Sequence, residues 1–425
     1  MRKRRNSIFA GIDWTLVLFF IVLVFIGWIN IYAASVTNTS GEILDFSTRY
    51  GKQIQWIGLS IVLIIIIISI DAKFYERFSG IFYIVSMLSL AGLFVFGTNI
   101  NGATSWYNLG FSSIQPSEFA KIATALALAN FLNEPNKDLS NLKTQLSAFL
   151  ILLLPAILIT LQPDAGSALI YFTLTFVLYR EGLPSYYLAI GFLAIILFLI
   201  TLSLGFTSSI IIIFSIITLF IVYLINTKKY HLNREWPKVV SLYVFIGLFL
   251  FSVDFVFNNV FEQRHRDRFN IILGENSDTR GIGYNTNQSM LTIGSGGLTG
   301  KGFLEGDRTQ GKFVPEQDTD YIFSTVGEEW GFIGSSAVII IFIAFILRLI
   351  WVAERQKSKF SRVFGYSVAT IFFFHFMINI GMVIGLLPTI GIPLPFFSYG
   401  GSSLWGFTIL LFIFIRLDAD RTYEW

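Results

Sequence analysis

The sequence predicts an all-α polytopic membrane protein, a bundle of transmembrane helices with one large extracytoplasmic loop. Three observations predict this class: 54% of the 425 residues are hydrophobic, only 13% are charged, and long apolar runs recur along the chain. A soluble globular domain carries roughly a quarter charged residues. A chain this apolar is therefore expected to fold within a membrane.

Twelve segments are long and apolar enough to be membrane spans, for which a helix needs about 20 mostly apolar residues. The first follows a basic cluster at 2–5, and its apolar run is too long for a signal peptide, so we expect an uncleaved span. The twelve candidates lie at 13–34, 53–71, 79–97, 117–133, 145–162, 165–180, 184–204, 208–226, 237–258, 321–347, 363–387 and 401–416.

Lysine and arginine set the orientation of these spans. With the N-terminus in the cytoplasm, 20 of the 30 lysines and arginines fall in cytoplasmic segments, whereas the short outer loops hold only Arg49 and Lys52. Seven more lie in the long loop 259–320, which crosses a membrane largely regardless of its charge, and Lys121 lies within a span. This asymmetry follows the positive-inside rule and predicts that both termini are cytoplasmic.

The composition excludes several kinds of site. The chain has no cysteine, which excludes disulfides, iron–sulfur clusters, thiolate zinc and cysteine nucleophiles. The three histidines, His231, His265 and His375, lie in different segments, so we do not expect a histidine metal site. A bound metal would need oxygen ligands, which favours magnesium, calcium or manganese.

The polar stretches that are more than turns all face outward in this topology: 98–116, 162–166, 259–320 and 388–400. No nucleotide is available on that side, so any chemistry there would run without ATP. The glycine-rich segment 294–302 lacks the spacing of a Walker phosphate loop. Its glycines indicate either a series of tight turns or a backbone nest for phosphate.

Three carboxylates, Glu316, Asp318 and Asp320, alternate directly before the apolar run that begins at Tyr321. In an extended segment they would share one face, and in a helical turn Glu316 and Asp320 would be paired at i, i+4. Either arrangement gathers negative charge, which raises the pKa of at least one carboxyl group and suits it to act as a base or to bind a divalent cation. The alternative is a solvated acidic loop.

Two charges also lie at the start of the fourth predicted span. Pro116 is typical of a first helical turn, and Glu118 and Lys121 share a face at i, i+3. The two side chains would either neutralise each other as an ion pair or present Lys121 to an anionic ligand.

Arginines and an irregular segment complete the outer surface. Arg264, Arg266 and Arg268 alternate after the ninth span, either as ordinary surface residues or as ligands of a lipid phosphate. Residues 388–403 are broken by Pro and Gly, and such backbone is tolerated at membrane depth only where it is buried in protein or lines a cavity.

Taken together, these strings resemble the SEDS (shape, elongation, division and sporulation) family of peptidoglycan glycosyltransferases. Within that family, the strings 283–289 and 391–395 are more similar to the elongation members than to the division members. The resemblance rests on the strings at 101–110, 115–121, 162–166, 283–289, 294–302, 315–334 and 388–403.

The resemblance implies a SEDS-type bundle of 10–12 transmembrane helices that forms one transmembrane domain over residues 1–425. It implies that the protein polymerises lipid II, a lipid-linked disaccharide-pentapeptide, and releases undecaprenyl pyrophosphate. By motif, Asp320 would be the general base. From the three acidic side chains themselves we expect a divalent cation, Mg²⁺ or Mn²⁺, held by Asp320, Asp318 and Glu316. The substrate-binding residues expected from the matching positions and the outer arginines are Glu118, Lys121, Trp106, Arg266, Arg268, Glu316, Gln288, Ser289 and Ser398.

The resemblance also implies partners and a location. The expected partners are lipid II, a class B penicillin-binding protein that acts as transpeptidase, other proteins of the elongation complex and the membrane, but no nucleic acid. The expected location is the bacterial cytoplasmic membrane, with the active site in the periplasm.

The sequence departs from the family at two places. The family usually has ten spans, and the two extra spans fall within 184–258, where an inserted helix pair would keep every later loop on its original side. Asp318 stands where the family usually has histidine, which argues against a role for histidine at this position and favours metal binding.

Two other functions compete with this one. A lipid II flippase would also need a cavity, buried charge and broken helices, but it needs no base and would tolerate Asp320→Asn. A scaffold that docks a partner in the membrane would make the carboxylates incidental.

Overall fold

The computed structural model describes residues 11–36, 45–100, 102–108, 110, 113–227, 232–260, 263–272 and 283–421. Its contacts divide the chain into two compact units, of which the first comprises residues 1–184 and 285–425 and the second residues 185–284. Each unit is described by itself.

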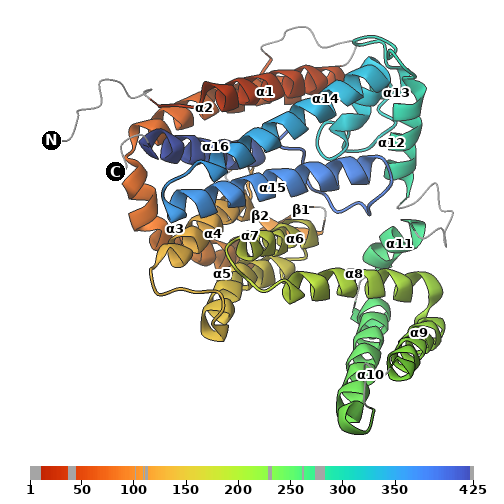
Figure 1. Ribbon diagram of the computed structural model, residues 1–425. Helices are drawn as coiled ribbons and strands as arrows, with labels where there is room; N and C mark the ends of the chain where they lie inside the picture. The colour runs from red at the N-terminus through yellow and green to blue at the C-terminus, as the bar shows by residue number, and fades with distance from the viewer. Residues whose placement is uncertain are drawn as a thin grey trace. The chain divides into compact units, whose positions relative to one another are not determined.

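The first unit consists of helices and one small sheet. Helices α1, α14, α15 and α16 run alongside one another, and α2 packs on α16 (Figure 1). The helices are α1 (Trp14–Ser35), α2 (Arg49–Ser69), α3 (Ala72–Phe96), α4 (Pro116–Asn133), α5 (Leu142–Thr160), α6 (Ala165–Thr173), α7 (Thr175–Arg180), α12 (Tyr284–Ser295), α13 (Asp307–Gln310), α14 (Ile322–Glu354), α15 (Lys359–Val383) and α16 (Gly401–Asp420).

Local chemistry explains where several helices begin. The carboxylate of Asp13 accepts a hydrogen bond from the Leu16 amide, and Thr48 and Asp71 cap α2 and α3 in the same way. Pro116 is the first residue of α4, as predicted, because its missing N–H group costs nothing at that position.

A three-stranded antiparallel sheet lies between α3 and α4, where the sequence was not expected to form strands. Its strands are β1 (Thr98–Ile100), β2 (Ala103–Asn108) and β3 (Ser113–Ile114), in the order β1-β2-β3. The main-chain amide of Thr104 donates to the Gln162 carbonyl, so the predicted outer segments 98–116 and 162–166 do meet.

The core of the first unit is rich in aromatic rings. Phe372 is fully buried, and its ring lies 5.2 Å from that of Phe396 and 5.4 Å from that of Phe407. Phe20 packs edge-on against Phe396 at 5.1 Å. The rings therefore join α1, α15, α16 and the segment before α16 in one packed core.

Charged residues gather where the predicted cytoplasmic ends of the helices meet. Arg348 and Arg355 near the end of α14 form ion pairs with Asp13 at 2.7 and 2.9 Å, and Arg355 also pairs with Asp418 near the end of α16. Arg362 near the start of α15 pairs with Glu181 at 3.0 Å. This arrangement agrees with the antiparallel order of spans that the sequence predicts.

The second unit is a helical unit of its own that begins near the predicted insertion at 184–258. Its elements are α8 (Tyr186–Leu204), α9 (Phe206–Asn226), α10 (Leu232–Phe255), the π-helical segment η1 (Val256–Val260) and α11 (Gln263–Ile272). Leu197, Ile213, Ile246 and Leu250 form its small buried core.

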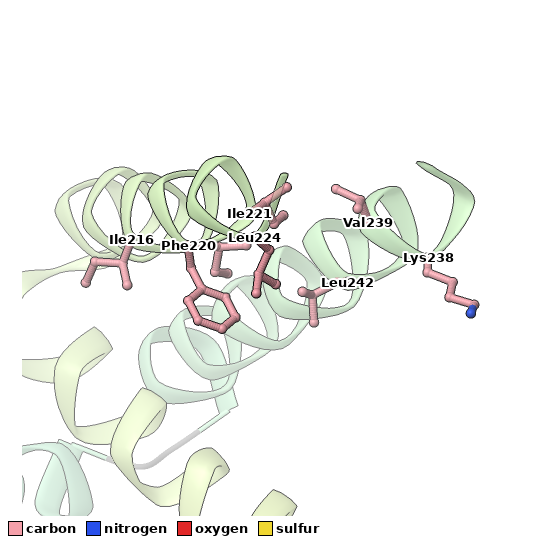
Figure 2. Close-up of a pocket in the computed structure, with 8 residues that line it drawn as sticks. Ile216, Phe220, Ile221, Leu224, Lys238, Val239 and Leu242 are labelled. Carbon is pink, nitrogen blue, oxygen red and sulfur yellow. The ribbon is translucent and has the colours of Figure 1, made fainter. Parts of the chain in front are cut away.

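Figure 2 shows a groove on the second unit between α9 and α10. Its lining is apolar except for Lys238, with Phe220, Leu224 and Leu242 among the side chains that form its wall. None of the predicted site residues lines this groove, so it is not a candidate for the chemistry.

All twelve predicted spans coincide with helices, and the fold class is confirmed as an all-α polytopic bundle. Ten of the described helices are long and apolar enough to cross a membrane. The predicted spans outside these ten are α4, which carries Glu118 and Lys121, and the pair α6 and α7, which is interrupted at Leu174.

Candidate functional site

Asp320 lies in a series of turns between α13 and α14, two residues before the first residue of α14. Its side chain is half-buried. A methyl group added at Gly391 would lie 3.4 Å from Asp320 Oδ2, so the carboxylate lies against the main chain of the segment between α15 and α16. The Asp320 side chain is therefore exposed enough for a ligand to reach it, and its remaining surface lies against protein.

The irregular stretch predicted at 388–403 lies in the segment 384–400 between α15 and α16, and its last three residues are instead the first turn of α16. Ile392, Leu394 and Phe397 are all at most 1% exposed, so this part of the segment is buried in protein, whereas Gly391 is exposed. Burial also raises the pKa of the Tyr399 phenol, so this group stays protonated at neutral pH.

The three alternating carboxylates have different surroundings. Asp318 is buried and forms an ion pair with Arg49, the first residue of α2. Glu316 is exposed, has a positive φ of 53°, and accepts a hydrogen bond from the Thr319 hydroxyl at 3.1 Å. The turn at Glu316 breaks the extended geometry on which the shared face depended.

This geometry does not build a metal site from protein side chains alone. In the described part of the chain, no three His, Asp or Glu side chains are grouped in a way that could hold an ion. The expected ligand set of Glu316, Asp318 and Asp320 therefore does not fit a metal as the structure stands, because Asp318 is engaged with Arg49.

Glu118 and Lys121 form a buried ion pair on α4. The Lys121 ammonium lies 2.8 Å from Glu118 Oε1 and 3.0 Å from the Nε2 atom of His375, and all three residues are at most 3% exposed. The ammonium also lies 5.0 Å from the centre of the Phe407 ring. The structure thus contains the predicted ion pair. An anionic ligand would have to compete with Glu118 and His375 for the Lys121 ammonium.

Helix α15 links this ion pair to Asp320. His375 contacts Lys121, and Asn379, one turn further along α15, donates to the Asp320 carbonyl at 2.8 Å. Residues four apart share a face of a helix and are separated by about 6 Å along its axis. The ion pair and the Asp320 main chain therefore meet one face of α15 at successive turns.

Other predicted substrate-binding residues are engaged within the first unit. The Ser289 hydroxyl donates to the Val383 carbonyl at 2.9 Å, and the Ser398 hydroxyl donates to the Thr319 carbonyl at 2.6 Å. Gln288 accepts a hydrogen bond from Arg308, and Trp106 is half-buried in β2. Their contact with substrate stays a prediction.

The predicted arginines belong to the second unit. Arg266 donates to the Asn258 carbonyl at 3.1 Å, and Arg268 lies on the same helix, α11. The side chain of Arg264 lies outside the described residues. The role of these arginines at Asp320 stays a prediction.

The glycine-rich segment 294–302 forms tight turns against α14. The amides of Lys301 and Gly302 donate to the carbonyls of Glu328 and Glu329, each at 3.0 Å. A methyl group at Gly300 would lie 2.1 Å from the Glu329 carbonyl oxygen, so glycine is required there. These amides are used for packing, which favours the tight-turn interpretation over a phosphate nest.

Glu328 is the anchor of this packing. Its carboxylate is fully buried and accepts hydrogen bonds from the Lys301 ammonium at 2.7 Å and from the Thr309 amide and hydroxyl at 2.7 and 2.8 Å. The same contact raises the pKa of Lys301. This cluster fixes the loop that leads to Asp320.

Sequence reasoning missed His375, Asn379 and Arg49. The first two carried a usable signal, since polar side chains at i, i+4 within an apolar helix usually mark a site. Arg49 carried none, because its partner Asp318 lies 269 residues away along the chain.

Comparisons with known proteins agree with the resemblance. A family model described as FtsW/RodA/SpoVE, cell cycle protein, matches residues 13–423. Peptidoglycan glycosyltransferase RodA of Treponema pallidum is 31% identical over 452 residues, which cover 99% of this chain and 100% of the relative. Peptidoglycan glycosyltransferase MrdB of Escherichia coli K12 is 31% identical over 378 residues, which cover 88% of this chain and 86% of the relative.

Solved structures share the fold. A chain from a structure described as the structural coordination of polymerization and crosslinking by a peptidoglycan synthase complex matches with a TM-score of 0.70 at 25% identity, over 97% of this chain and 99% of that chain. The crystal structure of Thermus thermophilus rod shape determining protein RodA matches with a TM-score of 0.63 at 24% identity, over 97% of this chain and 98% of that chain.

Proposed function

Because the chain belongs to the FtsW/RodA/SpoVE family, we propose that it is a peptidoglycan glycosyltransferase that polymerises lipid II during cell elongation. Relatives that carry this activity in their names match nearly the whole chain. The observation that carries the proposal is Asp320, a half-buried carboxylate whose main chain is held by α15 beside a buried Glu118–Lys121 pair.

Asp320 acts as general base in this proposal. A hydroxyl oxygen of the acceptor sugar attacks the anomeric carbon of the donor, a new carbon–oxygen bond forms, and the bond from that carbon to the pyrophosphate oxygen breaks. The hydroxyl proton passes to the Asp320 carboxylate, and undecaprenyl pyrophosphate leaves with the bonding electron pair. A positioned base contributes about 10²–10⁴-fold to such a step.

The leaving group carries negative charge, and in this proposal cationic side chains stabilise that charge. For Arg266 and Arg268, binding of the pyrophosphate stays a prediction from the sequence, which rests on the pairing of guanidinium groups with phosphate oxygens. Lys121 contributes positive charge from the membrane interior, and Glu118 and His375 keep its ammonium in place. Glu316 and Trp106 contact the substrate in this proposal.

The partner and the location follow from the same proposal. A transpeptidase of the class B penicillin-binding proteins would cross-link the strands, and a match to a chain of a peptidoglycan synthase complex supports such an assembly. The helices long enough to cross a membrane support a place in the bacterial cytoplasmic membrane. The termini are cytoplasmic and Asp320 is periplasmic in this proposal.

The activity is tested by incubating the purified protein and its transpeptidase with fluorescent lipid II. Polymerisation should yield a ladder of glycan strands on a gel when the transpeptidase is blocked. Absence of polymer, with intact and monodisperse protein, would rule out the activity.

The topology makes a separate prediction. Single cysteines placed in 227–236 should react with an impermeant thiol reagent only after the membrane is opened, whereas cysteines in 276–312 should react in intact spheroplasts. The native chain has no cysteine, so it serves as an unlabelled control. The reverse labelling pattern would place Asp320 on the wrong side for lipid II polymerisation.

Metal dependence is tested by chelation. We propose that a divalent cation, Mg²⁺ or Mn²⁺, accompanies the pyrophosphate of the substrate, where a hard cation stabilises the leaving group. EDTA should then abolish polymerisation, and an excess of Mg²⁺ should restore it. Full activity in EDTA would show that Asp320 and the cationic side chains suffice.

A further inference from the structure

Three consecutive carbonyl groups around Asp320 are each held by a separate donor. The Tyr399 amide donates to the Asp318 carbonyl at 2.8 Å, the Ser398 hydroxyl to the Thr319 carbonyl at 2.6 Å, and the Asn379 amide nitrogen to the Asp320 carbonyl at 2.8 Å. A turn that is not part of a helix or strand has no hydrogen-bond ladder of its own. Here residues 379–399 supply the three donors instead.

Asn379 connects the turn at Asp320 with the main chain at 391–392, against which the Asp320 carboxylate lies. Its side-chain nitrogen also donates to the Ile392 carbonyl at 2.8 Å, one residue from the Gly391 main chain that faces the Asp320 carboxylate. Both neighbours of the amide are carbonyl oxygens, so the atom that faces them must be the NH₂ group, which has two donors. One side chain thus fixes the distance between Asp320 and the surface against which its carboxylate lies.

Burial shields this contact from water. Asn379 is fully buried, and its Oδ1 atom has no hydrogen-bond partner, so its amide nitrogen is the atom that is satisfied. An apolar residue at this position would remove the donor that the Asp320 and Ile392 carbonyls share.

We propose that Asn379 is a positioning residue for the glycosyl transfer, which sets the place of the Asp320 carboxylate through the main chain. This inference rests on the proposed function of Asp320 as base. Ser398 serves the same purpose at the adjoining carbonyl. A base displaced by about 1 Å can lose on the order of 10² in rate without loss of substrate binding.

The test is a double-mutant cycle on lipid II polymerisation with Asn379→Ala and Asp320→Asn. Asn379→Ala should lower kcat about 10- to 100-fold with little change in KM, because it moves the base and not the substrate contacts. On the Asp320→Asn background it should lower the residual rate less than about 2-fold, since no base remains to be positioned.

Asn30→Ala is the matched control. Asn30 is equally buried, its Oδ1 atom is likewise without a partner, and its amide donates at 2.8 Å to the Ile26 carbonyl of its own helix, α1. It should leave kcat within about 2-fold of wild type. If Asn379→Ala does not fold, Ser398→Ala takes its place in the cycle.

The outcomes separate the two claims. Equal losses from Asn379→Ala in both backgrounds, or no loss in either, would overturn the positioning role and leave Asp320 as base. Near wild-type activity of Asp320→Asn would instead overturn the proposed base and the positioning role together. A loss confined to the background with Asp320 supports the inference.

Discussion

Asp320→Asn should lower the rate of lipid II polymerisation by about 10²–10⁴-fold. Asparagine keeps the size of the side chain and most of its hydrogen bonding, but it carries no negative charge and cannot accept the proton of the acceptor hydroxyl. Because the Asp320 side chain is only half-buried, we expect expression, membrane insertion and co-purification with the transpeptidase to be unchanged. Initial rates on fluorescent lipid II would measure the effect.

Two matched variants serve as comparisons for Asp320→Asn. Glu316→Gln removes a carboxylate that is exposed and accepts its hydrogen bond from the Thr319 hydroxyl, so we expect a much smaller effect than at Asp320. Asp318→Asn weakens the ion pair with Arg49 and tests whether that pair matters for the fold. If Asp320→Asn polymerises at near wild-type rate, the base is elsewhere, with Glu316 or Asp318 next in line; loss of folding would make Asp320 structural.

Lys121→Met should destabilise the protein by about 3–5 kcal/mol, since it leaves the buried Glu118 carboxylate without its counter-charge. Both partners are 4% exposed at the side chain, so water cannot take the place of the ammonium. His375 also loses the group that lies 3.0 Å from its Nε2 atom. The thermal unfolding temperature in detergent should fall accordingly.

The double variant Glu118→Gln/Lys121→Met separates structure from chemistry. It replaces the ion pair by neutral side chains of similar size and should recover much of the lost stability. Recovery of stability without recovery of polymerisation would assign Lys121 a part in the reaction. An unchanged unfolding temperature for Lys121→Met alone would contradict the energetic importance of the pair.

The spans could be predicted because membrane crossing imposes a fixed length of apolar sequence. Segment 13–34 agrees with α1 to within a residue at each end. Segment 79–97 was predicted to start too late, because α3 begins at Ala72 and its first turns carry charged residues, including Lys73 and Glu76, that lower the local hydropathy. Local signals also sufficed for the helix start at Pro116.

Features that depend on distant partners could not be predicted. The sheet at 98–114 has strands of two to six residues, and its attachment to Gln162 is invisible in local sequence. The predicted span from 321 contains a break at Gly331, where φ is 64°, and this break forms where the glycine-rich segment 294–302 packs on the helix.

The candidate site was predicted in part. The Glu118–Lys121 pair follows from i, i+3 spacing on one helix, and the structure contains it. The neighbouring His375 is 254 residues from Lys121 along the chain, and no local pattern could join them. The alternating carboxylates were expected to share a face, but the positive φ at Glu316 and the ion pair of Asp318 with Arg49 separate their surroundings.

The central claim is that the protein transfers sugar at Asp320 with loss of a lipid pyrophosphate, and the reaction balance tests it most directly. Glycan polymer and undecaprenyl pyrophosphate should be quantified together in proteoliposomes loaded with lipid II, for wild type and for Asp320→Asn. We predict one undecaprenyl pyrophosphate released per glycosidic bond formed in the wild type, and a parallel loss of both products in the variant. Movement of lipid II across the bilayer at equal rates in both proteins, with neither product formed, would contradict the account.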